Sequence, residues 1–268
     1  MKYKFGIFST GRDIEAIRLF REIYDSVEMG VINGKIAYLF CNREQGEEKI
    51  TDSLIKLVRD YGIELTTFSS KRFKNVMRKK AIEESKRMRR DSPLLIQWRN
   101  EYDREVMERI PASFDIYLIG YMLIIGPEMC KSYNILNLHP APPGGPQGSW
   151  QEVMEKLIQS NAKEAGCMMH LVTPELDKGP PISYCTFPIV GDDYEPLWQE
   201  YYSTGNYDKL FSKIREEEFK RESPLVIHTI KAFADGKIWI DRKKVMTREG
   251  EATKGYCLNG VIEDAIHY

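Results

Sequence analysis

Short apolar runs alternate with amphipathic stretches of helical period along most of the 268-residue chain. A repeat of two is typical of a strand and a repeat of about 3.6 is typical of a helix. The apolar runs predict strands at residues 3–9, 35–41, 64–68, 116–120, 135–139, 166–172 and 182–189. The helical repeats predict helices at residues 12–24, 49–61, 72–89, 99–110 and 150–160. This βαβα order predicts a doubly wound, mostly parallel, Rossmann-like α/β sheet.

The pattern changes after the last predicted strand. A long helical segment at residues 207–234, interrupted near Pro224, precedes a run at residues 236–245 whose alternation predicts a small hairpin. We therefore expect one domain, residues 1–268, with a basic helical insertion at 71–110 and a C-terminal helix and hairpin extension at 205–268.

Composition narrows the class of protein. With 42% apolar and 29% charged residues, the chain can bury a large core and stay in solution. Its five cysteines never form a C-x-x-C pair, which predicts neither a disulfide framework nor a zinc site and fits the cytoplasm. We expect no secretory signal, because the N-terminus runs directly into a strand pattern, and no membrane span, because no apolar run reaches about 18 residues. The net charge of -1 gives no argument for nucleic acid binding, which we do not expect.

Candidate chemistry gathers around the predicted strand at residues 135–139. Asn137 and His139 are two residues apart, so their side chains project from the same face of that strand. The proline- and glycine-rich run after His139 ends the strand, and open α/β sheets bind ligands at such strand ends. Asn137 can donate a hydrogen bond to an oxyanion and His139 titrates near neutral pH, while Asp177 can hold the imidazole tautomer or relay a proton.

The sequence also allows purely structural roles for Asn137, His139 and Asp177. Isolated Asn-x-His and Asp-x-Gly pairs are common in proteins. His139 would then simply end a buried strand, and Asp177 would make a turn with Gly179.

The turn after the first predicted strand is a second candidate site. It reads Ser9-Thr10-Gly11-Arg12-Asp13 and opens a helix. Backbone N–H groups at such a helix start can hold a phosphate. Alternatively, Asp13 caps the helix and has no role in binding.

Taken together, these motifs resemble the folate-dependent formyltransferase family, and within it the phosphoribosylglycinamide (GAR) formyltransferases. The resemblance extends over nearly the whole chain in the expected order. Besides the segments above, it includes Tyr102-Asp-Arg-Glu105, Gly120-Tyr-Met-Leu-Ile-Ile125, the aspartate loop at residues 170–180 and the terminal segments at residues 224–227 and 233–236.

The resemblance implies roles for individual residues. Asn137 would stabilise the tetrahedral oxyanion, His139 would help to polarise the formyl group, and Asp177 would move a proton from the attacking amine towards the leaving folate nitrogen. The folate-binding residues would be Met122, Leu123 and Ile125. The residues that bind the second substrate would be Ser9, Thr10, Gly11, Arg12 and Asp13, together with Glu217 or Glu218. The donor would be 10-formyltetrahydrofolate, and this chemistry requires no metal.

Departures from the family pattern leave the acceptor open. The family turn usually has two glycines and a Ser-Asn pair, where this chain has Ser9 and Gly11 and then Arg12-Asp13. A carboxylate beside a phosphate is unfavourable, although Arg12 can offset it by pairing with Asp13 or with the phosphate. The loop at residues 141–148 also differs from the family's usual Ser-Leu-Leu-Pro.

We therefore expect formyl transfer to a primary amine, with the phosphorylated glycinamide ribonucleotide of purine biosynthesis as the leading acceptor. The alternatives are transfer to a sugar nucleotide or another amine, hydrolysis of formyltetrahydrofolate, and a folate or nucleotide sensor without catalysis. A homodimer is compatible with these expectations. The basic stretch at residues 71–90 is read as a solvated helix face, with a guide for anionic ligands or a nucleic acid contact as alternatives.

Overall fold

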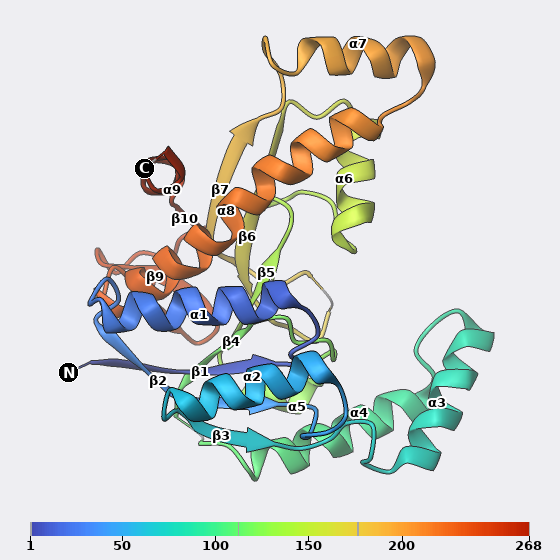
Figure 1. Ribbon diagram of the computed structural model, residues 1–268, viewed down its shortest axis with the longest axis vertical. Coiled ribbons are helices and arrows are strands. Elements are labelled where there is room, and N and C mark those ends of the chain that lie inside the picture. The colour runs from blue at the N-terminus through green and yellow to red at the C-terminus, as the bar shows by residue number, and fades with distance from the viewer. Residues whose placement is uncertain (1, 112, 176, 268) are drawn as a thin grey trace. The chain divides into compact units, whose positions relative to one another are not determined.

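The computed structural model describes residues 2–111, 113–175 and 177–267, and the chain separates into two compact units (Figure 1). The first unit comprises Met1–Asn137 and Val172–Lys178, and the second comprises Leu138–Leu171 and Gly179–Tyr268. Strand β5 (Ile135–His139) begins in the first unit and ends in the second. The expectation of one domain, with its insertion and extension, stays a prediction.

The first unit is built on parallel strands. β1 (Tyr3–Ser9), β2 (Gly34–Cys41), β3 (Glu64–Thr67) and β4 (Asp115–Leu118) join β5 in the order β5-β4-β1-β2-β3. Each neighbouring pair is parallel. The chain moves outwards from β1 to β3 and then returns to β4 on the other side of β1. The boundary between β1 and β4 is therefore the topological switch point, where open α/β sheets bind their ligands.

Helices follow the strands of the first unit. They are α1 (Ile14–Glu28), α2 (Lys49–Asp60), α3 (Asn75–Met88), α4 (Pro93–Met107) and α5 (Pro127–Ser132). Right-handed crossovers place α1 and α2 on one face and, because the chain reverses direction at the switch point, the later helices on the other. Trp98 and Tyr102 of α4 accordingly share a core with Phe8 and Phe40. In Figure 1, α3 and α4 form a helical hairpin.

The second unit is organised around a long helix. It contains α6 (Trp150–Gln159), β6 (Glu164–Leu171), β7 (Pro181–Pro188), α7 (Glu195–Thr204), α8 (Asp208–Ala234), β10 (Tyr256–Cys257) and α9 (Asn259–His267). β6 and β7 are antiparallel, and β10 pairs with β7 in parallel. α8 packs along β6 and β7 (Figure 1). A separate hairpin, β8 (Ile238–Asp241) and β9 (Lys244–Thr247), confirms the predicted C-terminal hairpin.

The predicted interruption near Pro224 is wrong, because α8 continues through this residue. A proline inside a helix removes one backbone donor and strains one turn. Leu225, Val226 and Ile230 are fully buried just after it. Burial of this apolar stripe against the strands favours helix on both sides of the proline.

Among the described residues, no helix has both the length and the apolar character needed to cross a membrane.

Candidate functional site

The predicted phosphate turn and the predicted folate loop meet at the switch point of the first unit. The backbone N–H of Thr10 donates to the Gly120 carbonyl over 3.2 Å. The backbone N–H of Met122 donates to the Thr10 hydroxyl oxygen over 2.9 Å. Thr10 thus links two segments that are 112 residues apart in sequence. The predicted phosphate turn and the predicted folate loop are therefore held side by side by hydrogen bonds.

The turn at residues 9–13 is held by buried polar contacts. The Ser9 hydroxyl accepts a hydrogen bond from the Gly11 N–H over 3.0 Å. The Thr51 hydroxyl lies 3.1 and 3.0 Å from the carbonyl oxygens of Thr10 and Gly11, and these two acceptors share its single proton. Gly11 has a φ of +58°, and a Cβ there would lie 3.1 Å from the Thr51 Cα and the Leu54 side chain. A glycine is therefore required at this position.

Arg12 and Asp13 show both arrangements that the sequence allowed. Asp13 is the N-cap of α1 and accepts a hydrogen bond from the Ala16 N–H over 3.0 Å. The Arg12 guanidinium pairs with the same carboxylate at 2.8 Å and also lies 3.3 Å from the Met122 sulfur. The side chain of Arg12 remains 51% exposed, so its charge is accessible to an anion. Phosphate binding by residues 9–13 stays a prediction.

The loop at residues 120–126 begins with a second required glycine. Gly120 has a φ of +63°, and a Cβ there would lie 2.6 Å from the Ala16 Cβ. The Met122 side chain is exposed, Leu123 is partly buried, and Ile125 lies within the core. Met122 and Leu123 can therefore offer side chains to a folate, whereas Ile125 can offer only its main chain. Their contact with folate stays a prediction.

Asp103 is a buried residue at the end of this loop, and the sequence analysis did not select it. It lies on α4, is 2% exposed, and its Oδ2 accepts a hydrogen bond from the Gly126 N–H over 2.5 Å. Burial raises the pKa of Asp103 to about 7, against the opposing effects of this hydrogen bond and of Arg99. The sequence offered one signal for this residue, which is its place beside the apolar face of the predicted helix at residues 99–110. That signal does not show that Asp103 is buried, because its burial depends on tertiary packing.

We expect the free energy of unfolding to fall with rising pH because of Asp103. A carboxyl whose pKa is higher in the folded state contributes stability below its unfolded pKa, and this contribution is lost as the pH rises through the folded pKa. The shift from 3.8 to about 7 corresponds to about 4 kcal/mol between pH 4 and pH 7. Urea unfolding should show this loss in wild type relative to Asp103→Asn. Asp60→Asn, at an exposed carboxylate, is the control and should follow wild type. Parallel stability curves for wild type and Asp103→Asn would contradict the expectation.

Two of the predicted catalytic residues, Asn137 and Asp177, lie in the first unit. Asn137 is half-buried and pairs in register with Leu118 of β4. The segment at residues 172–178 is tied to β5, because the Val172 N–H donates to the Ile135 carbonyl over 2.7 Å. This contact brings the aspartate segment to the strand that carries Asn137.

Asp177 has an unusual backbone conformation. Its φ is +55°, which is uncommon for residues other than glycine, although aspartate and asparagine tolerate it best. The turn around it is closed by a hydrogen bond from the Lys178 N–H to the Glu175 carbonyl over 3.3 Å. Backbone strain of this kind concentrates at functional sites. The neighbouring residue 176 lies outside the described residues.

His139 lies at the start of the second unit and is 3% exposed. Its Nε2 is 2.9 Å from the Pro146 carbonyl oxygen. Because a carbonyl can only accept, Nε2 carries a proton, and in the neutral ring Nδ1 is the acceptor. The ring packs edge-to-face on His170, with centroids 6.0 Å apart. His170 is also buried, and the sequence analysis did not select it as a site residue.

Glu217 and Glu218 lie on α8 within ion pairs. Burial opposes ionisation of Glu217, but hydrogen bonds from Lys220, Arg221 and Lys213 lower its pKa to about 2. Glu218 is fully buried, and burial raises its pKa although Arg215 lies 2.7 Å away. Neither position shows which of the two carboxylates would contact a ribose, so this role stays a prediction.

The basic stretch at residues 71–90 lies on and around α3. Lys71, Arg72 and Lys74 each pair with a glutamate of a neighbouring segment. Arg78 lies over the Trp98 ring, 5.3 Å from the centroid. Other basic residues of this stretch, such as Arg87, are exposed. These positions fit a solvated helix face, and binding of an anion there stays a prediction.

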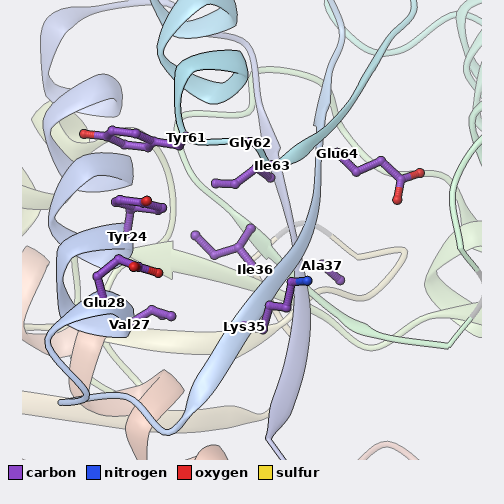
Figure 2. A pocket seen from close by; sticks show the side chains of 10 residues that line it. All are labelled: Tyr24, Val27, Glu28, Lys35, Ile36, Ala37, Tyr61, Gly62, Ile63 and Glu64. Carbon is purple, nitrogen blue, oxygen red and sulfur yellow. The ribbon is translucent and has the colours of Figure 1, made fainter.

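A pocket of about 240 Å³ lies elsewhere in the first unit (Figure 2). It is formed at the amino ends of β2 and β3, whereas the switch point lies at the carboxyl ends. Figure 2 shows Tyr24 and Tyr61 stacked at one wall, with ring centroids 3.8 Å apart. Within the described parts of the chain, none of the predicted site residues lines this pocket.

The described residues also contain no group of three or more His, Cys, Asp or Glu side chains suited to a metal ion.

A sequence model of the formyl transferase family matches residues 16–200. This match covers more than half of the chain and includes Met122, Asn137, His139 and Asp177. The chain therefore belongs to the formyl transferase family.

Two proteins that are similar to this chain in sequence are both named phosphoribosylglycinamide formyltransferase. Phosphoribosylglycinamide formyltransferase of Escherichia coli (strain K12) is 28% identical over 158 residues, which cover 55% of this chain and 66% of that protein. The enzyme of the same name from Saccharomyces cerevisiae (strain ATCC 204508 / S288c) is 38% identical over 93 residues, which cover 32% of this chain and 42% of that protein. The matches thus span less than two thirds of either relative.

Solved structures confirm the predicted α/β fold. Glycinamide ribonucleotide transformylase 1 from Symbiobacterium toebii superimposes with a TM-score of 0.59 at 19% identity, over 92% of this chain and 94% of that chain. Formyltetrahydrofolate deformylase from Burkholderia mallei ATCC 23344 superimposes with a TM-score of 0.57 at 14% identity, over 92% and 71%. At these identities the similarity concerns the fold alone.

Proposed function

We propose that the protein transfers a formyl group from 10-formyltetrahydrofolate to a primary amine, and that glycinamide ribonucleotide is the acceptor. The observation that carries the proposal is the family match, which spans the candidate folate loop and all three candidate catalytic residues. The names of the two sequence relatives support the choice of acceptor. The hydrogen bonds of Thr10 to the folate loop support a site at the switch point.

The proposed reaction forms one C–N bond and breaks another. The amine nitrogen attacks the formyl carbon and gives a tetrahedral oxyanion, to which the Asn137 amide donates a hydrogen bond. Asp177 accepts a proton from the attacking amine, directly or through water. The folate nitrogen leaves with a proton, and the C–N bond to the acceptor remains. His139 can donate to the oxyanion through Nδ1 only when its ring is protonated, since its Nε2–H already binds Pro146.

The turn at residues 9–13 decides which acceptor the proposed site can bind. Asp13 uses its carboxylate as the cap of α1 and as the partner of Arg12. A ribotide phosphate at this helix start would meet that carboxylate, and the exposed Arg12 guanidinium would have to offset the repulsion. A sugar nucleotide with a primary amine would meet the same groups.

Turnover with different acceptors tests the proposal. Purified protein is given 10-formyltetrahydrofolate with glycinamide ribonucleotide, with an amino sugar nucleotide, or with no acceptor. Formylation of glycinamide ribonucleotide is the expected result. Formylation of the sugar nucleotide alone would change the acceptor, and release of formate without an acceptor would indicate a hydrolase. Folate binding without any turnover would indicate a sensor.

A further inference from the structure

We propose that Asp103 is a positioning residue, which fixes the loop at residues 120–126 through the backbone N–H of Gly126. The inference deepens the proposed function, and it rests on that function only for the ligand of the loop, a folate.

The loop is anchored at both ends by hydrogen bonds to side chains. Near its start the Met122 N–H donates to Thr10, and at its end the Gly126 N–H donates to Asp103. The side chains of Met122, at the first anchor, and of Ile124, between the two anchors, are 50% and 38% exposed. The loop is therefore fixed at both ends, and between them its main chain and its exposed side chains are available to a ligand.

Asp103 is itself held rigidly by α4. The adjacent Tyr102 is fully buried, and its hydroxyl donates to the Phe68 carbonyl over 2.6 Å. The Tyr102 ring stacks on Trp98 at 5.3 Å and on Phe68 at 5.2 Å. This aromatic packing fixes the helix against the core, so the carboxylate presents its oxygen at a defined place.

The end of the loop fits closely around this carboxylate. A Cβ on Gly126 would lie 2.7 Å from Asn100 Oδ1 and 2.9 Å from Asp103 Oδ2. The charged groups that act on Asp103 are Arg99 of the same helix, which favours its ionised form, and Glu128 of α5, which disfavours it. A buried carboxyl costs stability unless it is well paired. The hydrogen bond from the Gly126 N–H partly offsets the cost of burying this carboxyl, and it also holds the end of the loop in place.

Two substitutions of Asp103 distinguish the role of its hydrogen-bond acceptor oxygen from the role of its charge. Asp103→Ala removes the oxygen that accepts the hydrogen bond from the Gly126 N–H, whereas Asp103→Asn keeps a carbonyl oxygen that can accept it. Asn100 Oδ1 lies on the same side of Gly126 and has no hydrogen-bond partner among the described residues, so it does not compete as a donor for the retained carbonyl oxygen. Asp91→Ala is the control, because Asp91 is an exposed carboxylate of the same helical hairpin that pairs with Arg99.

Amide hydrogen exchange at residues 119–127 is the first readout, and it does not depend on any substrate. We expect exchange about tenfold faster in Asp103→Ala, as loss of one charge-assisted hydrogen bond implies, and near wild type in Asp103→Asn and Asp91→Ala. In turnover, Asp103→Ala should raise KM for the folate donor about tenfold, while kcat and KM for the acceptor change little.

A wild-type measurement covers the case in which Asp103→Ala does not fold. The amide proton resonance of Gly126 should shift as Asp103 titrates near pH 7. Unchanged exchange in folded Asp103→Ala, equal impairment in Asp103→Asn, or an amide resonance that does not titrate would each overturn the inference. Faster exchange with no turnover by wild type on any amine would instead reject the proposed function and leave the anchoring intact.

Discussion

Asn137→Ala is expected to lower kcat by about 10²–10³ while the protein stays folded, because it removes the hydrogen-bond donor that we propose for the developing oxyanion. Asn137 is half-buried in β5, and its backbone pairs with β4 independently of its side chain. Steady-state kinetics measure the loss, and circular dichroism with thermal melting shows whether the fold is kept.

Asn33→Ala is the matched control for this substitution. Asn33 is exposed in the turn before β2, and its contribution to structure is a backbone carbonyl that accepts from the Tyr3 N–H. The control should keep wild-type turnover. Wild-type turnover in Asn137→Ala as well would remove Asn137 from the mechanism.

Asp177→Asn is expected to lower kcat by about 10²–10⁴, the usual contribution of a positioned proton-transfer group. Asparagine has nearly the same shape and tolerates the φ of +55°, so the turn should be preserved. The variant therefore tests the proton and not the backbone. The measurement is kcat with saturating donor and acceptor.

The control for Asp177→Asn comes from the same turn. Glu175 is exposed, and its backbone carbonyl closes the turn. Glu175→Gln removes an exposed carboxylate and should leave kcat unchanged. If Asp177→Asn also retained wild-type kcat, the attacking amine would have to lose its proton to another group.

Much of the fold could be predicted because its signals are local. The strands at residues 3–9 and 135–139 were predicted with the bounds that the structure shows, since their apolar runs end at clear turn residues. The helix α5 was missed, because its six residues offer too few turns in which a helical repeat can be seen. The helix α7 was missed although it is as long as α6, because it buries only Trp198 and so has no clear apolar repeat. The continuity of α8 through Pro224 was also missed, because burial decides it and local sequence does not.

The catalytic roles of the candidate site residues stay predictions, but some of their positions could be predicted from sequence. Asn137 and His139 lie two residues apart on β5, as the strand pattern predicted. The hydrogen bond between Thr10 and Met122 joins segments that are distant in sequence, so no local pattern predicts it. Asp103 could not be recognised either, since only the packing of α4 shows that its carboxylate is buried beside Gly126.

The central claim is the transfer of a formyl group to an amine, and an isotope label tests it most directly. Protein is incubated with glycinamide ribonucleotide and 10-formyltetrahydrofolate that carries ¹³C in the formyl group, and the ribonucleotide is analysed by mass spectrometry. The account predicts a protein-dependent ribonucleotide product that carries one labelled formyl group and that forms about 10²–10³ times more slowly with Asn137→Ala. Label that appears only as free formate, or that stays on the folate, would contradict it.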